Sequence, residues 1–275
     1  MRFNFSKIHG SGNDFIVIDH RNKILEKWPP HFVQHLCKFH TGIGADGLLL
    51  LEHSEKADFR MRFFNSDGYE AEMCANGSRC ICYFAYKKGI VEKEFIFEAM
   101  DGNHKASIEN ESKVKVEVLW NQKIEKRTVP SDFNFPANVQ FKNYLNTGVP
   151  HLVLQCSDID RVDVEEIGNN LRFHQYYAPA GTNVNFVEVL KNDDELKLKV
   201  RTFERGVDAE TLSCGSGVTA SALSYFNPHL KADYIKINTP GGELTVFITK
   251  KQDSIFLLGP VKIVYEGNYL EEDIL

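Results

Sequence analysis

Two cysteines, Cys74 and Cys214, stand at the start of two similar segments, each before a largely apolar run that predicts a buried helix. A thiol at a helix N-terminus lies beside unpaired backbone N–H groups and the positive end of the helix dipole, which favours the thiolate. The same N–H groups bind carboxylates. Small residues follow each cysteine and would let a ligand approach these amides: Ala75, Asn76, Gly215 and Ser216. The pattern therefore predicts two thiolate-forming cysteines, each beside a carboxylate-binding turn.

Two such thiols on either side of one carbon atom suit the inversion of an amino-acid α-carbon. One thiolate removes the α-proton from one face, and the other thiol delivers a proton to the opposite face. The negative charge that develops on the carbon delocalises into the carboxylate, where the two helix dipoles stabilise it. Because this chemistry without a cofactor needs a dry, closed cleft, we expect the cysteines to come from two domains that face each other.

The segments around the two cysteines indicate an internal duplication. Residues 63–78 and 202–217 both read as a strand, an acidic loop with a Glu, a Cys, a turn of small residues and a buried helix. Upstream, residues 12–19 match residues 182–188 as a second duplicated piece. We therefore predict two similar domains, residues 1–125 and 126–260, with the boundary near Lys123 to Val129 and the active site in the cleft between them.

The remaining pattern is rich in short strands. Residues 114–119, 195–200 and 243–248 alternate apolar and polar side chains, and Gly and Asn turns separate many such runs. We expect helices at 31–38, at 75–88 with Gly89 as the C-terminal cap, and from Gly215 to about Phe226. No regular alternation of strand and helix is present, so the pattern favours an α+β fold of curved, mostly antiparallel sheets, each around a buried helix.

Seven motifs that span most of the chain resemble those of the diaminopimelate epimerases, in that family's order. They cover residues 7–15, 40–47, 64–68, 73–79, 147–151, 183–186 and 204–217. The resemblance implies two pseudo-symmetric domains, each a β-barrel-like sheet around a central helix, with a last strand at 261–275 that returns to the N-terminal one. It also implies interconversion of LL- and meso-2,6-diaminopimelate, in lysine and peptidoglycan precursor biosynthesis. It further implies a cofactor-free enzyme and a homodimer.

The same resemblance assigns roles to individual residues. Cys74 and Cys214 match the catalytic pair, and His151 and Glu204 match positions that orient the catalytic groups. The matching substrate-binding positions are Asn13, Asn65, Ala75, Asn76, Asn183, Glu204, Arg205, Gly215 and Ser216. Arg205 is suited to a two-pronged contact with the distal carboxylate of the substrate.

Three positions depart from the family pattern. Val149 stands where many members have an Asn that contacts the substrate, and Gly47 stands where some members have a Gln. Ala75 replaces a common Gly, which keeps the backbone N–H and adds a methyl group. None of the three is part of the thiol pair, so they bear on the substrate contacts and not on the reaction class.

Composition excludes several other classes of protein. The 32 basic and 38 acidic residues give a net charge of −6, and the basic residues are scattered, so we expect no nucleic-acid partner. No apolar run approaches the ~18–20 residues of a membrane span, and the N-terminus lacks the apolar region of a secretory signal. We therefore expect a cytoplasmic protein with reduced cysteines, of which Cys37, Cys80, Cys82 and Cys156 are packed in the core.

Three rival functions remain open on the residues alone, of which a non-catalytic binding module is disfavoured by the presence of both thiols. Another cofactor-independent racemase or isomerase, of the proline or hydroxyproline type, would need a different distal pocket, which the pair Glu204-Arg205 disfavours. A thiol redox protein would usually carry Cys-x-x-Cys, which the chain lacks. A zinc site built on Cys37 and His40 together with Cys74, Cys80 and Cys82 has an unusual ligand spacing, so we expect no metal.

Overall fold

The computed structural model describes residues 2–120, 127–190, 195–227, 229, 232–251 and 253–270. Its chain divides into two compact units. The N-terminal unit contains Met1–Glu117 and Gly259–Leu275, and the C-terminal unit contains Val118–Leu258. The boundary predicted at residues 125–126 and the last five residues of the predicted strand 261–275 lie outside the described residues.

The strands of the N-terminal unit close into a barrel, in the order β1-β2-β3-β4-β6-β7-β8-β16, with β16 also paired to β1. Most neighbours are antiparallel, while β2–β3 and β4–β6 are parallel. The elements of this unit are β1 (Arg2–Gly10), β2 (Asn13–Asp19), α1 (Pro30–Cys37), β3 (Gly47–Glu52), β4 (Phe59–Asn65), β5 (Glu70–Ala71), α2 (Ala75–Lys87), β6 (Glu94–Ala99), β7 (Gly102–Asn110), β8 (Lys113–Glu117) and the second part of β16 (Ile255–Leu270).

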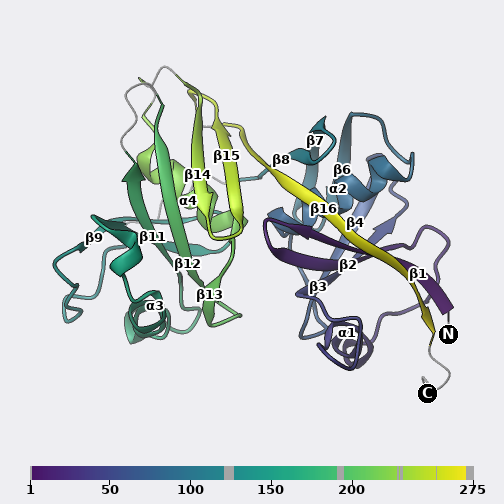
Figure 1. The fold of residues 1–275 in the computed structure, drawn as a ribbon, viewed down its shortest axis with the longest axis horizontal. Helices are drawn as coiled ribbons and strands as arrows, with labels where there is room; N and C mark the ends of the chain where they lie inside the picture. The colour runs from purple at the N-terminus through teal and green to yellow at the C-terminus, as the bar shows by residue number, and fades with distance from the viewer. Residues whose placement is uncertain are drawn as a thin grey trace. The chain divides into compact units, whose positions relative to one another are not determined.

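Helix α2 is the central helix of this barrel (Figure 1). It contacts β1, β2, β3, β4, β7 and β8, and every residue from Ala75 to Ala85 is buried. The helix stops after Lys87, and Gly89 follows with a φ of +67°, a backbone conformation that glycine adopts at little cost. The helix predicted at 75–88 is confirmed to within one residue.

The C-terminal unit is a curved sheet in the order β9-β10-β11-β12-β14-β15-β16 around the central helix α4 (Figure 1). Here β10–β11 and β12–β14 are the parallel pairs. The elements are β9 (Val139–Asn146), β10 (Pro150–Cys156), η1 (Ile159–Arg161), α3 (Val164–Arg172), η2 (Gln175–Tyr177), β11 (Asn183–Leu190), β12 (Lys197–Glu204), β13 (Ala209–Thr211), α4 (Gly215–Tyr225), β14 (Tyr234–Thr239), β15 (Gly242–Ile248) and the first part of β16. The predicted α+β class of two pseudo-symmetric halves is therefore confirmed.

The register of the two units shows how they correspond. Phe63 pairs with Ala71, three residues before Cys74, and Thr202 pairs with Thr211, three residues before Cys214. The predicted match of residues 63–78 with 202–217 is therefore confirmed.

The second predicted match, of residues 12–19 with 182–188, is wrong. These residues form β2 and β11, but β2 corresponds to β10, because β2 pairs in parallel with β3 as β10 pairs with β11. Both β2 and β11 begin with polar residues and continue into a buried apolar run, and this pattern does not say which neighbour a strand takes.

Two outer helices explain why the central strands are apolar on both faces. Phe32, Val33 and Leu36 of α1 belong to one apolar cluster with residues of β2 and β3. Val164, Ile167 and Leu171 of α3 belong to another cluster, and α3 contacts β11 and β12. Helix α3 was not predicted from the sequence. Its signals are the apolar spacing at i, i+3 and i+7 and the N-cap Asp163, which accepts a hydrogen bond from the Glu166 N–H. No helix within the described ranges is long and apolar enough to cross a membrane.

Candidate active site

Cys74 is the N-cap residue of α2, as the sequence predicts. Its backbone is extended, and its Sγ accepts a hydrogen bond from the N–H of Gly77 at 3.5 Å. The Sγ atom also lies 3.9 Å from Oδ1 of Asn13, and the side chain is only partly buried. The half-buried thiol therefore sits against the first-turn amides of the helix, where a thiolate is stabilised.

A polar network fixes the amide of Asn13 next to this thiol. Asn13 Nδ2 donates to Asp46 Oδ2, and Asn13 Oδ1 accepts from Asn76 Nδ2 at 3.4 Å. Asp46 also accepts from the Asp14 N–H, and Asp14 forms an ion pair with Lys7 at 2.6 Å. Because both ends of the amide are engaged, the oxygen of Asn13 faces the thiol. Asp46 lies in the motif at residues 40–47, but no role was predicted for it from the sequence.

Cys214 is the N-cap residue of α4, at the same place in the C-terminal unit. It is buried, and its Sγ lies 3.4 Å from Oγ of Ser216. The Cys214 side chain makes no capping hydrogen bond to its helix, unlike that of Cys74. Thr147 Oγ1 donates to the carbonyl of Ser216 at 3.1 Å, which fixes the first turn of the helix next to the loop before β10.

His151 is wholly buried on β10, in a network that determines where its proton lies. Asn185 Nδ2 donates to His151 Nδ1 at 3.1 Å and to the Leu152 carbonyl, while Asn185 Oδ1 accepts from Thr202 Oγ1 at 3.0 Å. This fixes the Asn185 amide, so Nδ1 of His151 is an acceptor and the proton is on Nε2.

The charge of His151 follows from the same surroundings. Burial, and secondarily the positive charge of Arg205, lower the pKa of His151 to about 3, so the imidazole is neutral near pH 7. Within the described residues, Nε2 has no hydrogen-bond partner. His151 is thus a neutral donor, and Asn185 and Thr202 are residues of this site that the sequence analysis missed.

The predicted substrate contacts of the C-terminal unit gather at the ends of β11 and β12. Asn183 is buried, donates to the Pro150 carbonyl at 2.9 Å, and accepts from the Arg205 N–H at 2.8 Å. Arg205 donates from its guanidinium to the Ala180 carbonyl. Glu204 accepts from Thr211 Oγ1 at 2.9 Å. Asn183 therefore positions the backbone of Arg205, in addition to any contact it makes with a substrate.

Packing accounts for one of the departures from the family pattern. A Cβ atom at Gly47 would lie 2.6 Å from the Phe64 carbonyl oxygen and 2.7 Å from the Phe63 ring, so a side chain needs a shift of β4. Ala75 is the buried first residue of α2. Asn65, the last residue of β4, has an exposed side chain and occupies the place that Glu204 takes at the end of β12.

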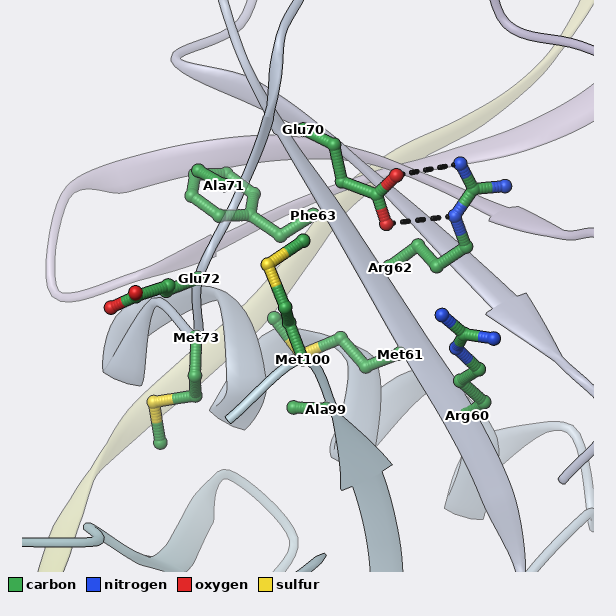
Figure 2. A pocket seen from close by; sticks show the side chains of 10 residues that line it. All are labelled: Arg60, Met61, Arg62, Phe63, Glu70, Ala71, Glu72, Met73, Ala99 and Met100. Carbon is green, nitrogen blue, oxygen red and sulfur yellow. Dashed lines mark hydrogen bonds and ion pairs between the residues drawn. The ribbon is translucent and has the colours of Figure 1, made fainter. Parts of the chain in front are cut away.

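A pocket lies on β4 and β5, just before Cys74 in the chain (Figure 2). Arg62 and Glu70 face each other in it through two hydrogen bonds of 2.9 and 2.8 Å. Met61, Met73 and Met100 add apolar surface. The two charged side chains satisfy each other, and none of the predicted site residues lines the pocket, so it is not the candidate active site. Across the described residues, no three His, Cys, Asp or Glu side chains are gathered as in a metal site.

Each unit therefore assembles one half of the predicted set. The N-terminal unit brings Cys74, Asn76 and Asn13 together at the start of α2. The C-terminal unit brings Cys214 and Ser216 to the start of α4, and groups Asn183 with Arg205. A thiol, first-turn amides and fixed polar side chains are the groups that proton transfer next to a carboxylate requires.

Comparison with known proteins agrees with this geometry. The family model described as diaminopimelate epimerase matches residues 5–119 and 143–264. The diaminopimelate epimerase of Aquifex aeolicus is 44% identical over 280 residues, covering 98% of each chain. That of Archaeoglobus fulgidus is 35% identical over 288 residues and covers all of both chains.

Solved structures of lower identity share the fold. A phenazine biosynthesis protein of the PhzF family from Bacillus anthracis has a TM-score of 0.73 at 16% identity, covering 98% of this chain and 100% of that one. A probable proline racemase from Agrobacterium radiobacter has a TM-score of 0.66 at 15% identity, covering 98% and 93%. The match to the family model and the identity to its named members show that this chain belongs to the diaminopimelate epimerase family of isomerases.

Proposed function

We propose that this chain interconverts LL- and meso-2,6-diaminopimelate by two-base proton transfer between Cys74 and Cys214. The observation that carries the proposal is that both cysteines are the N-cap residues of equivalent central helices. Family membership supports the substrate, since relatives that are 44% and 41% identical are named diaminopimelate epimerases.

In the proposed reaction, the two thiols exchange roles. The thiolate of one cysteine takes the α-proton, and the thiol of the other delivers its proton to the opposite face of the same carbon. The carbanion between these steps delocalises into the α-carboxylate, which the first-turn N–H groups of both helices bind. After one turnover the substrate carbon is inverted, and the negative charge has moved from one sulfur to the other. The amides involved belong to Ala75, Asn76, Gly215 and Ser216.

The other polar residues hold the substrate and the catalytic groups. Arg205 binds the distal carboxylate with its planar guanidinium, and Asn13, Asn65, Asn183 and Glu204 bind the remaining polar groups of the substrate. His151 donates from Nε2 as a neutral imidazole, a role supported by the burial of this nitrogen, for which the described part of the chain offers no hydrogen-bond partner.

We also propose the cofactor requirement, the oligomeric state and the cellular location of this enzyme. Because two thiols supply both the base and the acid, the reaction requires neither cofactor nor metal. We propose a homodimer that works in the cytoplasm on a small-molecule substrate, in lysine and peptidoglycan precursor biosynthesis. Epimerase activity that disappears with a chelator would contradict a metal-free reaction. A monomeric active species in solution would contradict the homodimer.

A substrate analogue with a leaving group beside the α-carbon tests the division of labour between the thiols. Elimination from this analogue needs proton abstraction but no reprotonation. Cys74→Ser and Cys214→Ser should each lose epimerisation almost completely, because both faces are needed. Each variant should keep elimination with one stereoisomer, and the two variants should keep opposite ones.

Two further measurements test the reaction itself and the choice of substrate. The unmodified protein should incorporate deuterium at the α-carbon of LL-diaminopimelate in deuterated water, and proline and hydroxyproline serve as control substrates. Equal elimination from both isomers in both variants would mean that one shared base does the chemistry. Turnover of proline in place of diaminopimelate would assign the protein to the rival racemase function.

A further inference from the structure

Arg79 is the largest wholly buried side chain of the described residues, and it lies under the first turn of α2. Its side chain runs back toward the helix N-terminus, where it donates to the Ala75 carbonyl at 3.2 Å and to Asn76 Oδ1 at 2.8 Å. It also donates to Ser11 Oγ, in the turn between β1 and β2, at 3.2 Å. All three acceptors are neutral, and Nε has no partner among the described residues.

A buried guanidinium without a carboxylate is unusual, because burial of an unpaired charge is costly. Burial lowers the pKa of Arg79 to about 10, so it still carries its positive charge near pH 7. The ionisable groups that act against this effect are the thiols of Cys80 and Cys74. The guanidinium donates to Ala75 and Asn76, the two residues directly after Cys74, so its charge lies next to the first helical turn that Cys74 caps.

Only one of these two thiols is placed to ionise and so to balance the positive charge of Arg79. Cys80 is wholly buried, and burial raises its pKa far above the ordinary thiol range in spite of Arg79. Cys74 is partly exposed, and it accepts a hydrogen bond from the Gly77 N–H. The anion that balances Arg79 is thus placed best on Cys74.

The C-terminal unit has no charge at the equivalent position. Thr219 follows Cys214 by five residues, as Arg79 follows Cys74, and its hydroxyl donates to the Gly215 carbonyl at 2.9 Å. Beneath α4 lie the neutral His151 and its partner Asn185. The two thiols therefore stand in electrostatically different surroundings, although the backbone around them is duplicated.

We propose that Arg79 is a positioning residue whose buried guanidinium holds Cys74 as the thiolate in the resting enzyme, while Cys214 rests as the thiol. The inference rests on the proposed function only for the statement that these two thiols react. It adds a direction: the resting protein is poised to take a proton with Cys74 and to give one with Cys214.

Other charged groups near α2 do not replace Arg79 in this role. Lys7 on β1 is neutralised by Asp14, and Asp46 binds Asn13, so these three contribute at most one net negative charge near Cys74. On β7, the buried His104 bonds to Asp101. Arg79 is therefore the buried positive charge of α2, and its hydrogen bonds within the described residues go to neutral oxygens.

The test is the pH dependence of thiol alkylation by iodoacetamide, with each modified cysteine located by peptide mapping. In the unmodified protein, the alkylation midpoint of Cys74 should lie below that of Cys214. In Arg79→Gln it should rise by about one to two pH units, the size of effect that a nearby opposite charge produces. Arg79→Lys, which keeps the charge, should restore most of the difference. Thr219→Val is the matched control and should leave the Cys74 midpoint in place.

These readouts separate an electrostatic role from a purely structural one. If Arg79 only connects the β1–β2 turn to the helix, Arg79→Gln lowers thermal stability and leaves the Cys74 midpoint unchanged, which would overturn the proposal. If Arg79→Gln does not fold, the unmodified protein still decides, because a Cys74 midpoint at or above that of Cys214 refutes the inference. Alkylation needs no substrate, so the result is independent of whether diaminopimelate is epimerised.

Discussion

Acidification should destabilise the folded protein through His151. The folded imidazole has a pKa of about 3, because burial and then the charge of Arg205 disfavour the imidazolium, whereas the ordinary value is 6.5. Between these two values the unfolded chain binds a proton at this residue and the folded chain does not. The stabilisation is therefore fully present above about pH 6.5 and is lost as the pH falls from 6.5 toward 3.

The size of the effect follows from the two pKa values. Each pH unit between them is worth about 1.4 kcal/mol of unfolding free energy. At pH 5, roughly 1.5 units below the unfolded pKa, protonation of His151 in the unfolded chain should therefore lower the free energy of unfolding by about 2 kcal/mol relative to pH 7.5. That is a substantial part of the ~5–15 kcal/mol that stabilises a typical domain, so the shift lies within reach of ordinary denaturation experiments.

The assay compares the original protein with His151→Gln, which has no group that titrates in this range. Urea unfolding at pH 7.5 and pH 5 gives four free energies of unfolding, and their double difference cancels the contribution of the other nine histidines and of the carboxylates. We expect the original protein to lose about 2 kcal/mol more than the variant on acidification. Equal losses would show that His151 binds its proton alike in both states, and the assignment of a neutral Nε2–H donor would then fail.

Three further predictions concern packing, substrate binding and oxidation. Gly217→Ala should lower the free energy of unfolding by about 1–3 kcal/mol, because its Cβ would lie 2.2 Å from a buried amide oxygen. The equivalent Gly77→Ala, 3.3 Å from a leucine methyl group, should change it little, and similar urea midpoints for the two variants would contradict this reading. Arg205→Lys should reduce kcat/KM for diaminopimelate roughly 10- to 100-fold, since Lys lacks the planar fork, and near-normal kinetics would remove Arg205 as the carboxylate clamp. Mild oxidation should inactivate the enzyme through a Cys74–Cys214 disulfide, and peptide maps of inactive protein with both thiols free would refute it.

The sequence by itself determined the two cysteines that cap helices and the helices that follow them. Both cysteines precede apolar runs, and a run that is apolar on all sides predicts a buried helix whatever surrounds it. The end of α2 was predictable for a local reason, because Lys87-Lys88-Gly89 combines cations with a glycine that takes positive φ. Signals of this kind act within one turn of the chain, so they need no knowledge of the fold.

Only the tertiary structure decided which strands correspond and which polar groups meet. The central strands are buried on both faces, by α2 or α4 on one side and by α1 or α3 on the other, so their apolar runs carry no alternation that fixes a neighbour. The match of β2 with β11 failed for this reason.

The buried polar groups were hidden from the sequence for a related reason. A single Arg79 in an apolar helix reads as a side chain that reaches solvent, and Asn185 reads as one more polar residue in a strand. Their roles come from contacts across long stretches of chain, from Arg79 to Ser11 and from Asn185 to His151. Whether a charge is solvated or buried beside a thiol depends on what the fold places over it, and no local pattern in the sequence encodes that.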